Sequence, residues 1–100
     1  MAKSSTERVR AHALALAGTR EVETWGRETF RFGDSIFAAL HDDLLILRSA
    51  REEQETRLAD RRFRAAPYWG RYGWVAIESH DIRSDSELKR LLKDAWGLAQ

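Results

Sequence analysis

The sequence predicts an α+β fold, a two-layer sandwich in which an antiparallel meander sheet has N- and C-terminal helices packed on one side. Apolar residues recur at helical spacing near both ends of the chain, and short apolar or alternating runs separated by turn residues fill the middle. The 100 residues suffice for one hydrophobic core, so we expect a single domain over residues 1–100.

The first helix is expected to begin at a capping box formed by Ser4 and Glu7 and to end at Gly18. Its apolar residues Val9 and Ala13 are four positions apart, which is the spacing of one helical face. The residues after Gly18 are interpreted as a charged connection to the sheet.

The central part of the chain predicts three consecutive strands. Residues 29–32 alternate between polar and aromatic side chains, as a half-buried strand does, and a Gly-Asp turn at 33–34 follows. A second strand is expected over 36–40, with an Asp-Asp turn at 42–43 after it. Residues 44–47 are apolar on both faces, which is typical of a central strand covered on each side.

The C-terminal half predicts two helices around one strand. Ser49 and Glu52 form a capping-box pattern that opens a polar surface helix ending at Leu58. Residues 74–79 alternate as a strand. The last helix opens with a capping box at 84–87 and carries an apolar stripe that we expect to pack on the sheet: Leu88, Leu91, Leu92, Ala95, Trp96 and Ala99.

Composition excludes several classes of function. Without cysteine the chain can hold neither disulfides nor thiolate metal sites, and it has no cysteine nucleophile. The net charge of +1 creates no global field towards nucleic acid or anionic lipid, so polyanion binding requires a local patch. The apolar run 13–17 is too short for a signal-peptide core or a membrane span, so we expect a cytoplasmic protein with no membrane partner.

No sequence pattern indicates a catalytic centre. The three histidines are far apart in the chain, and neither a GxSxG elbow nor a GxxxxGK[ST] loop is present. The segments 41–43 (His-Asp-Asp) and 80–81 (His-Asp) have metal-ligand character, but we interpret them as solvated turn residues. We therefore expect no enzyme activity, no catalytic residues, no cofactor and no metal site.

The most distinctive segment is PYWGRYGW, residues 67–74, which has four aromatic residues and one arginine. Together with the preceding residues it carries a local charge of +4 between Arg57 and Trp74, since five arginines face one acid, Asp60. In a functional interpretation, the arginines neutralise phosphates while Trp69 or Tyr72 stacks on a base or sugar.

The same segment has a structural interpretation. Large aromatic residues of small domains are usually buried, so Tyr68 and Trp74 would enter the core and Trp69 would cover a sheet edge. The arginines would then form a solvated face. Both interpretations remain open, with different aromatic residues in each role.

Three phrases of the sequence resemble the MmcQ/YjbR-like family: ALALAGTREVETWGRETFRFGDSIFAAL, AAPYWGRYGWVAIE and SELKRLLKDAWGLAQ. Departures are Ala17 where the family tends to have proline, Asp34 and Ser35 around a usual lysine, and a short middle region. The resemblance implies a CyaY-like fold and a proposed DNA-binding role through a double-wing arrangement of loops. The first helix lacks the acidic character by which frataxins, which share the gross fold, bind iron.

Our sequence-based hypothesis is therefore a small binding module with weak, sequence-tolerant affinity for DNA. The expected nucleic-acid contacts are Arg61, Arg62, Arg64, Trp69, Arg71 and Tyr72, with Arg27 and Arg31 on the predicted hairpin. The alternative is a domain that binds a protein or a small metabolite and has no nucleic-acid role, with the aromatic residues closing a pocket or an interface. The oligomeric state does not follow from the sequence.

Overall fold

The structure is a computed structural model that describes residues 5–24 and 26–100. The elements follow in this order: α1 (Ser5–Leu14), β1 (Thr19–Thr24), β2 (Arg27–Phe32), β3 (Ser35–His41), β4 (Leu44–Leu47), α2 (Arg51–Leu58), β5 (Phe63–Ala65), the 3-10 turn η1 (Trp69–Tyr72), β6 (Val75–Glu78), the 3-10 turn η2 (Ser79–Asp81) and α3 (Asp85–Leu98). Within the described residues, no helix combines the length and apolar character needed to cross a membrane.

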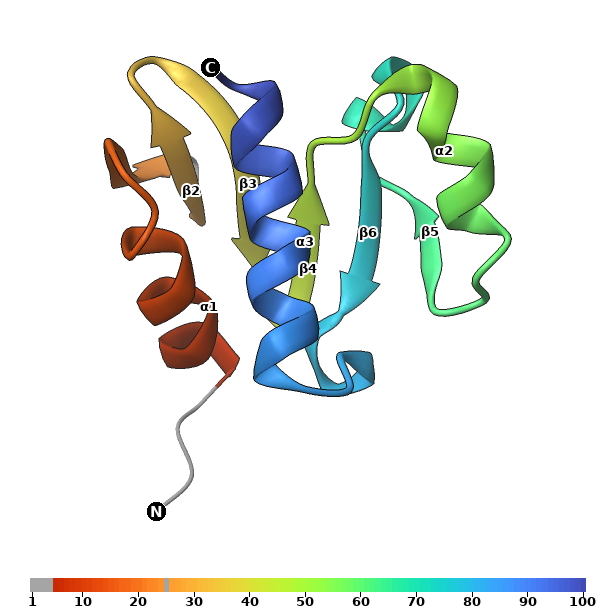
Figure 1. Ribbon diagram of the computed structural model, residues 1–100, viewed down its shortest axis with the longest axis horizontal. Coiled ribbons are helices and arrows are strands. Elements are labelled where there is room, and N and C mark those ends of the chain that lie inside the picture. The colour runs from red at the N-terminus through yellow and green to blue at the C-terminus, as the bar shows by residue number, and fades with distance from the viewer. Residues whose placement is uncertain (1–4, 25) are drawn as a thin grey trace.

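The strands form one six-stranded antiparallel sheet in the order β1-β2-β3-β4-β6-β5. Strands β1 to β4 are a meander, and β6 joins β4 before β5 closes the far edge. Helices α1 and α3 lie across one side of this sheet, and α2 lies beside β5 (Figure 1). The α+β sandwich with terminal helices on one side is confirmed.

The main core lies between the sheet and the helices α1 and α3. Phe30, Phe37 and Leu45 of the sheet are fully buried there against Val9 of α1 and Leu92 of α3. The apolar stripe expected on the last helix is confirmed, because its leucines are buried and Trp96 packs at the margin. Burying such side chains is the dominant stabilising contribution in a domain of this size.

A β-bulge in β3 decides which side chains face the helices. Phe30 pairs with Ala38 while the next residue, Arg31, pairs with Ile36, so that Phe37 is the extra residue. Phe37 and Ala38 therefore both enter the helix-side core. Ile36 is thereby turned to the opposite side, where it becomes part of the site described below.

Helix α3 begins as the sequence predicts. The side chain of Ser84 accepts a hydrogen bond from the backbone N–H of Glu87 at 3.1 Å. The Glu87 carboxylate accepts one from the backbone N–H of Arg83 at 2.9 Å. One of the N–H groups that a helix start leaves without a partner is thus satisfied, while the Glu87 carboxylate binds the residue before the N-cap.

Two edge strands were not predicted. The segment interpreted as a charged connection contains β1, and the arginine-rich segment contains the three-residue β5. Both are edge strands with mostly charged or small residues, so neither has the apolar alternation that identifies a strand. Their structure comes from pairing with β2 and β6 instead.

The other helix starts differ from the prediction. The N-cap of α2 is Ala50, and Ser49 donates its hydroxyl to the Ala50 carbonyl oxygen at 3.4 Å, so the expected capping box is not formed. Helix α1 ends at Leu14, four residues before Gly18. Ser4, the expected cap of α1, lies outside the described residues.

Candidate functional site

The side of the sheet that faces away from α1 and α3 is called the open face here. A row of small or β-branched residues crosses it, with Thr29 of β2, Ala39 of β3, Ile46 of β4 and Ala76 of β6 aligned by strand pairing. Among the described residues, side chains and not a helix cover this row, principally Trp69 and Trp74. Small side chains let the aromatic rings lie close to the sheet.

The aromatic loop, residues 67–74, is fixed to the sheet edge and to α2. Gln54 of α2 donates to the carbonyl oxygens of Gly70 at 2.8 Å and Trp74 at 3.1 Å. Gly73 has a φ of 101°, and a Cβ there would lie 2.5 Å from the Arg51 Cα at the start of α2. Glycine is therefore required by both the backbone angle and the close contact.

The rings of the loop differ greatly in exposure. Trp69 and Trp74 pack together with their ring centroids 5.0 Å apart and are half-buried. Tyr68 is 79% exposed and Tyr72 is 53% exposed. The structural interpretation of the sequence is thus wrong for Tyr68, which does not enter the core, because a backbone turn directs it outwards. Trp74 packs against the open-face cluster instead of the helix-side core.

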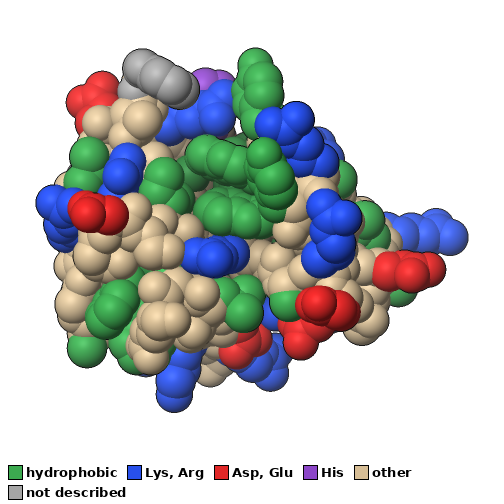
Figure 2. Space-filling view, turned by 90° about the horizontal axis from the view of Figure 1, so that it is seen from above, with side chains coloured by type: hydrophobic (Ala, Val, Ile, Leu, Met, Phe, Trp, Pro, Cys, Tyr) green, Lys and Arg blue, Asp and Glu red, His purple; other side chains and the backbone are tan. Residues whose placement is uncertain are grey.

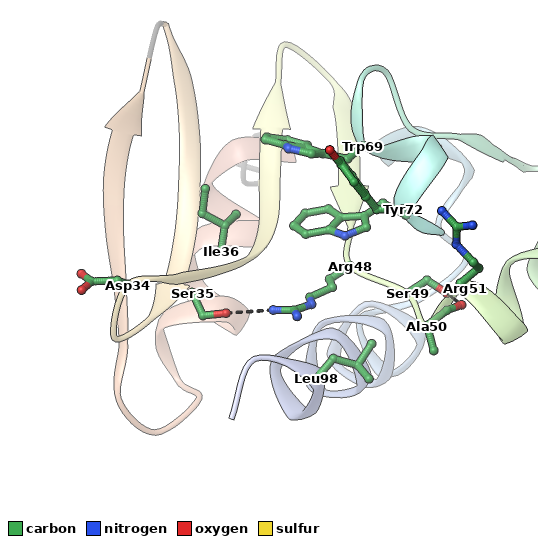
Figure 3. Close-up of a pocket in the computed structure, with 11 residues that line it drawn as sticks. Asp34, Ser35, Ile36, Arg48, Ser49, Ala50, Arg51, Trp69, Tyr72 and Leu98 are labelled. Atoms are coloured by element: carbon green, nitrogen blue, oxygen red, sulfur yellow. Dashed lines mark hydrogen bonds between the residues drawn. The ribbon is translucent and has the colours of Figure 1, made fainter.

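Two hollows flank the Trp69 ring. The first, the Arg48 hollow, measures about 580 Å³ and is lined by Arg48, Arg51, Trp69, Tyr72 and Trp74 among others. In Figure 3, Arg48 extends across it to Ser35, with Trp69 and Tyr72 on one side and Leu98 on the other. The second, the Tyr68 hollow, measures about 480 Å³ and is lined by Thr24, Arg27, Ile36, Tyr68 and Trp69. Trp69 and Ile36 line both hollows, so the two adjoin.

The arginines around these hollows have few acidic neighbours. Within residues 5–24 and 26–100, five of them form no ion pair with a carboxylate: Arg27, Arg31, Arg48, Arg51 and Arg71. Figure 2 shows hydrophobic side chains gathered around a hollow on one side of the molecule, with Lys and Arg side chains beside them. The open face therefore combines uncompensated positive charge with exposed rings.

These arginines are held by neutral partners. Arg31 donates to the hydroxyls of Thr29 at 3.3 Å and Thr24 at 3.0 Å, and Arg48 donates to the Ser35 hydroxyl at 2.8 Å. The remaining guanidinium groups use rings or backbone: Arg27 lies 5.6 Å from the Tyr68 centroid, Arg71 lies 4.9 Å from the Tyr72 centroid, and Arg51 donates to the Arg71 carbonyl oxygen. Such contacts orient a guanidinium without cancelling its charge.

Arg20 and Arg64, which lie on the outer strands of the open face, are paired. Arg20 contacts Asp34 at 2.9 Å, and Arg64 contacts Glu78 at 3.2 Å. The Arg64 side chain is nevertheless 60% exposed, so its ion pair is a solvated surface contact that contributes little to stability.

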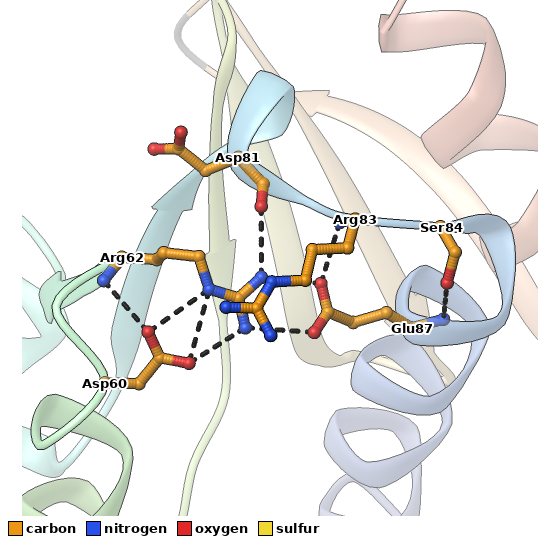
Figure 4. Close-up of polar contacts among 6 residues, drawn as sticks. All are labelled: Asp60, Arg62, Asp81, Arg83, Ser84 and Glu87. Carbon is orange, nitrogen blue, oxygen red and sulfur yellow. Dashed lines mark hydrogen bonds and ion pairs between the residues drawn. The ribbon is translucent and has the colours of Figure 1, made fainter.

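Arg62 belongs to a different part of the molecule. It donates to Glu87 at 2.7 Å and 2.9 Å and to Asp60 at 2.8 Å, and it also reaches the Asp81 carbonyl oxygen (Figure 4). These bonds lower the pKa of Asp60 and of Glu87 to about 2. Arg62 therefore joins the turn before β5 to the start of α3 and has no donor direction left for a phosphate on the open face.

The structure brings together only some of the residues expected from the sequence. Those on or beside the open face are Arg27, Arg31, Arg64, Trp69, Arg71 and Tyr72. Arg61 is exposed in the turn before β5, at the end of that strand opposite to the aromatic loop. Residues that the sequence analysis missed are Thr24, Ile36, Arg48, Arg51 and Tyr68. For Arg48 a signal existed, since it lies two positions after the open-face residue Ile46 and continues its alternation.

His41 and His80, which the sequence analysis considered as metal ligands, each contact a neighbouring acid. His41 is 3.9 Å from Asp42, and His80 is 3.7 Å from Asp81. No group of three or more His, Asp or Glu side chains in the described part of the chain is placed to hold a metal ion. Asp42, with a φ of 54°, is a turn residue as the sequence predicts.

Comparison with known proteins adds a family and a fold. The family model described as YjbR matches residues 14–98. A solved Deinococcus radiodurans protein whose domain is described as DUF419 superimposes with a TM-score of 0.78 at 16% sequence identity, covering 93% of this chain and 76% of that one. At this identity the likeness shows a shared fold. None of the curated proteins compared matches the chain.

Proposed function

The chain belongs to the YjbR family, and from the geometry of its open face we propose that it is a binding module for nucleic acid and not an enzyme. The observation that carries the proposal is that five arginines on or beside the open face have neutral partners and, in the described residues, no carboxylate partner, and that they lie beside exposed tyrosines. Positive charge neutralises phosphates, and flat rings stack on bases or sugars.

The sheet supports this function by its rigidity. The contacting side chains project from paired strands and from a loop held by Gln54, so little ordering is required when a ligand binds. The helix side holds the core, which leaves the open face free for a ligand. The arrangement of an antiparallel sheet with exposed aromatic residues on one face is one that nucleic-acid-binding domains use.

We expect affinity to be modest and largely independent of sequence. The net charge of +1 supplies little long-range attraction, and no helix presents a base-reading set of side chains on the open face. If about four phosphates are neutralised, the logarithm of affinity falls with the logarithm of salt concentration at a slope of roughly −3 to −4.

The test compares two triple variants with the same change in net charge. Arg27→Ala, Arg48→Ala and Arg71→Ala remove open-face charge, whereas Arg61→Ala, Arg83→Ala and Arg90→Ala remove exposed charge elsewhere. Fluorescence anisotropy with a labelled mixed-sequence DNA, as single strand and as duplex, gives affinity and salt slope. The open-face variant should lose at least tenfold in affinity at low salt, with a salt slope shallower by roughly 2 to 3. The control variant should keep most of both.

Equal losses in the two variants would show a nonspecific charge effect and reject the open face as the interface. No salt-dependent binding to either DNA would reject a nucleic-acid function altogether. In that case the Tyr68 hollow, with its largely apolar lining and a volume within the range of small-molecule sites, favours a small-metabolite or protein partner. Binding of that kind would depend on Trp69 and be indifferent to the arginines.

A further inference from the structure

The Tyr68 ring is presented to solvent by an unusual backbone conformation. Tyr68 has φ 63° and ψ −49°, and the backbone N–H of Trp69 donates to the Pro67 carbonyl oxygen at 2.7 Å. These values describe a classic γ-turn, a rare and strained conformation for a residue with a side chain. Because Tyr68 is 79% exposed, burial of the side chain does not explain the strain. Such strain is often found where a side chain is aimed at a ligand.

The Tyr68 hollow beside this ring has the composition of a stacking site. Tyr68 and Trp69 supply aromatic surface, Ile36 supplies an apolar wall, and Thr24 supplies a hydroxyl. Arg27 lies at the Tyr68 ring with its guanidinium carbon 5.6 Å from the ring centroid. A volume of about 480 Å³ is large enough for one planar heterocycle with its sugar.

The adjoining Arg48 hollow has complementary chemistry. It shares Trp69 and Ile36 with the Tyr68 hollow, and it adds the guanidinium groups of Arg48 and Arg51. A nucleotide chain alternates planar bases with phosphates. A base in the Tyr68 hollow would thus place an adjoining phosphate towards Arg48 and Arg51, whose hydrogen-bond partners among the described residues are a hydroxyl and a carbonyl oxygen.

We propose that the open face takes single-stranded nucleic acid, with an unpaired base stacked in the Tyr68 hollow and its backbone passing Trp69 towards Arg48. This inference rests on the proposed function and specifies its ligand. In a duplex, the faces of the bases are covered by their neighbours, so that only base edges and the backbone are accessible. The faces become accessible to Tyr68 and Trp69 when the strand is single.

The experiment uses the full chain and four labelled 12-nucleotide probes: single-stranded DNA, RNA of the same sequence, the DNA duplex, and a single strand whose bases are replaced by abasic sites. Tyr68→Ala is compared with Tyr68→Phe, which keeps the ring. Both single strands should bind more tightly than the duplex. Tyr68→Ala should weaken single-strand binding by roughly tenfold, whereas Tyr68→Phe should bind like the parent protein.

The abasic strand separates stacking from charge. It keeps the phosphates, so its salt slope should match that of the intact strand, while its affinity should already be reduced. Tyr68→Ala should then cause no additional loss, because the ring has no base to contact. If single-stranded DNA binds more tightly than RNA, or RNA more tightly than DNA, the difference in affinity identifies which sugar the open face prefers. Either result supports the proposal.

Several results would overturn the inference. The inference would be refuted if the duplex bound as tightly as the single strands or more tightly, and if Tyr68→Ala left the affinity unchanged. The proposed nucleic-acid function would still stand. A loss of abasic-strand affinity in Tyr68→Ala as large as that for the intact strand would show that the ring acts without a base. Failure of every probe to bind would refute both this inference and the proposed function.

Discussion

On the helix side of the sheet, Trp96 packs edge-on against Phe32 at a centroid distance of 6.1 Å, and its indole N–H donates to the Ala17 carbonyl oxygen at 2.9 Å. On the open face, Trp69 packs on Trp74 and borders two hollows. The first tryptophan joins a helix to the sheet, and the second lies between the sheet and the two hollows. Both tryptophans are half-buried, but the Trp96 indole N–H is used within the fold, whereas the Trp69 ring lines two hollows.

The arginines differ in the same way. Arg62 is bound by two carboxylates and a carbonyl oxygen, and only 18% of its side chain is exposed. Arg48 has a hydroxyl as its hydrogen-bond partner and borders a hollow. The difference teaches that the charge of a sequence segment does not locate a binding surface. What matters is whether each guanidinium is already neutralised by the fold.

The largest predicted effect belongs to the helix side. Leu92→Ala removes a fully buried side chain of α3 from the helix-side core and should lower the free energy of unfolding by about 2–5 kcal/mol. Urea unfolding followed by circular dichroism measures this. The open-face comparison is Tyr72→Ala. Tyr72 is 53% exposed, so this substitution should change the unfolding free energy by less than about 1 kcal/mol. Similar losses in the two variants would mean that the faces do not divide stability and binding as described.

The next effect concerns the Arg62 network and depends on pH. At neutral pH, Arg62→Met should cost about 1.5–3 kcal/mol of unfolding free energy, since hydrogen bonds between charged groups are lost. The pKa values of Asp60 and Glu87 are lowered to about 2 by Arg62, so the network stabilises the fold above their unfolded pKa values near 4. Its contribution is lost as pH falls from about 4.5 to 2.

The measurement for Arg62→Met is the difference in unfolding free energy between parent and variant at several pH values. The difference should be constant from pH 7 to about 5 and should shrink towards pH 2. A difference that does not change with pH would show that the ion pairs contribute little and that Arg62 acts through packing of its alkyl chain. Nucleic-acid affinity at neutral pH should be unaffected, in contrast to open-face arginine variants.

The fold could be predicted where burial controls the sequence pattern. Residues 44–47 and the stripe of α3 are apolar because both are enclosed by the core, and both predictions are confirmed. The edge strands β1 and β5 could not be found by pattern, because pairing and not burial defines them.

The candidate site was predictable only in part. The aromatic loop was recognisable by composition, but the separation of Arg62 from Arg71 depends on Glu87, a residue 25 positions away from Arg62 in sequence. The outward direction of Tyr68 depends on a γ-turn for which the sequence offers no established signal. A long-range ion pair and a rare backbone angle therefore explain why sequence reasoning misplaced Arg62 and Tyr68.

The smallest predicted effect separates stability from binding at one residue. Tyr68→Gly places the residue that best tolerates positive φ at the γ-turn, so relief of backbone strain should raise the unfolding free energy. The greater freedom of glycine in the unfolded chain should offset part of this gain. We expect a net change between zero and about +1 kcal/mol in thermal or urea unfolding. Tyr68→Ala, which keeps the strain and loses the ring, is the matched control and should not gain stability. Both variants should lose single-strand affinity alike, because both remove the ring. A Tyr68→Gly protein that is less stable than the alanine variant would show that the γ-turn is not strained, and the argument that the fold holds Tyr68 outwards for a ligand would lose its physical basis.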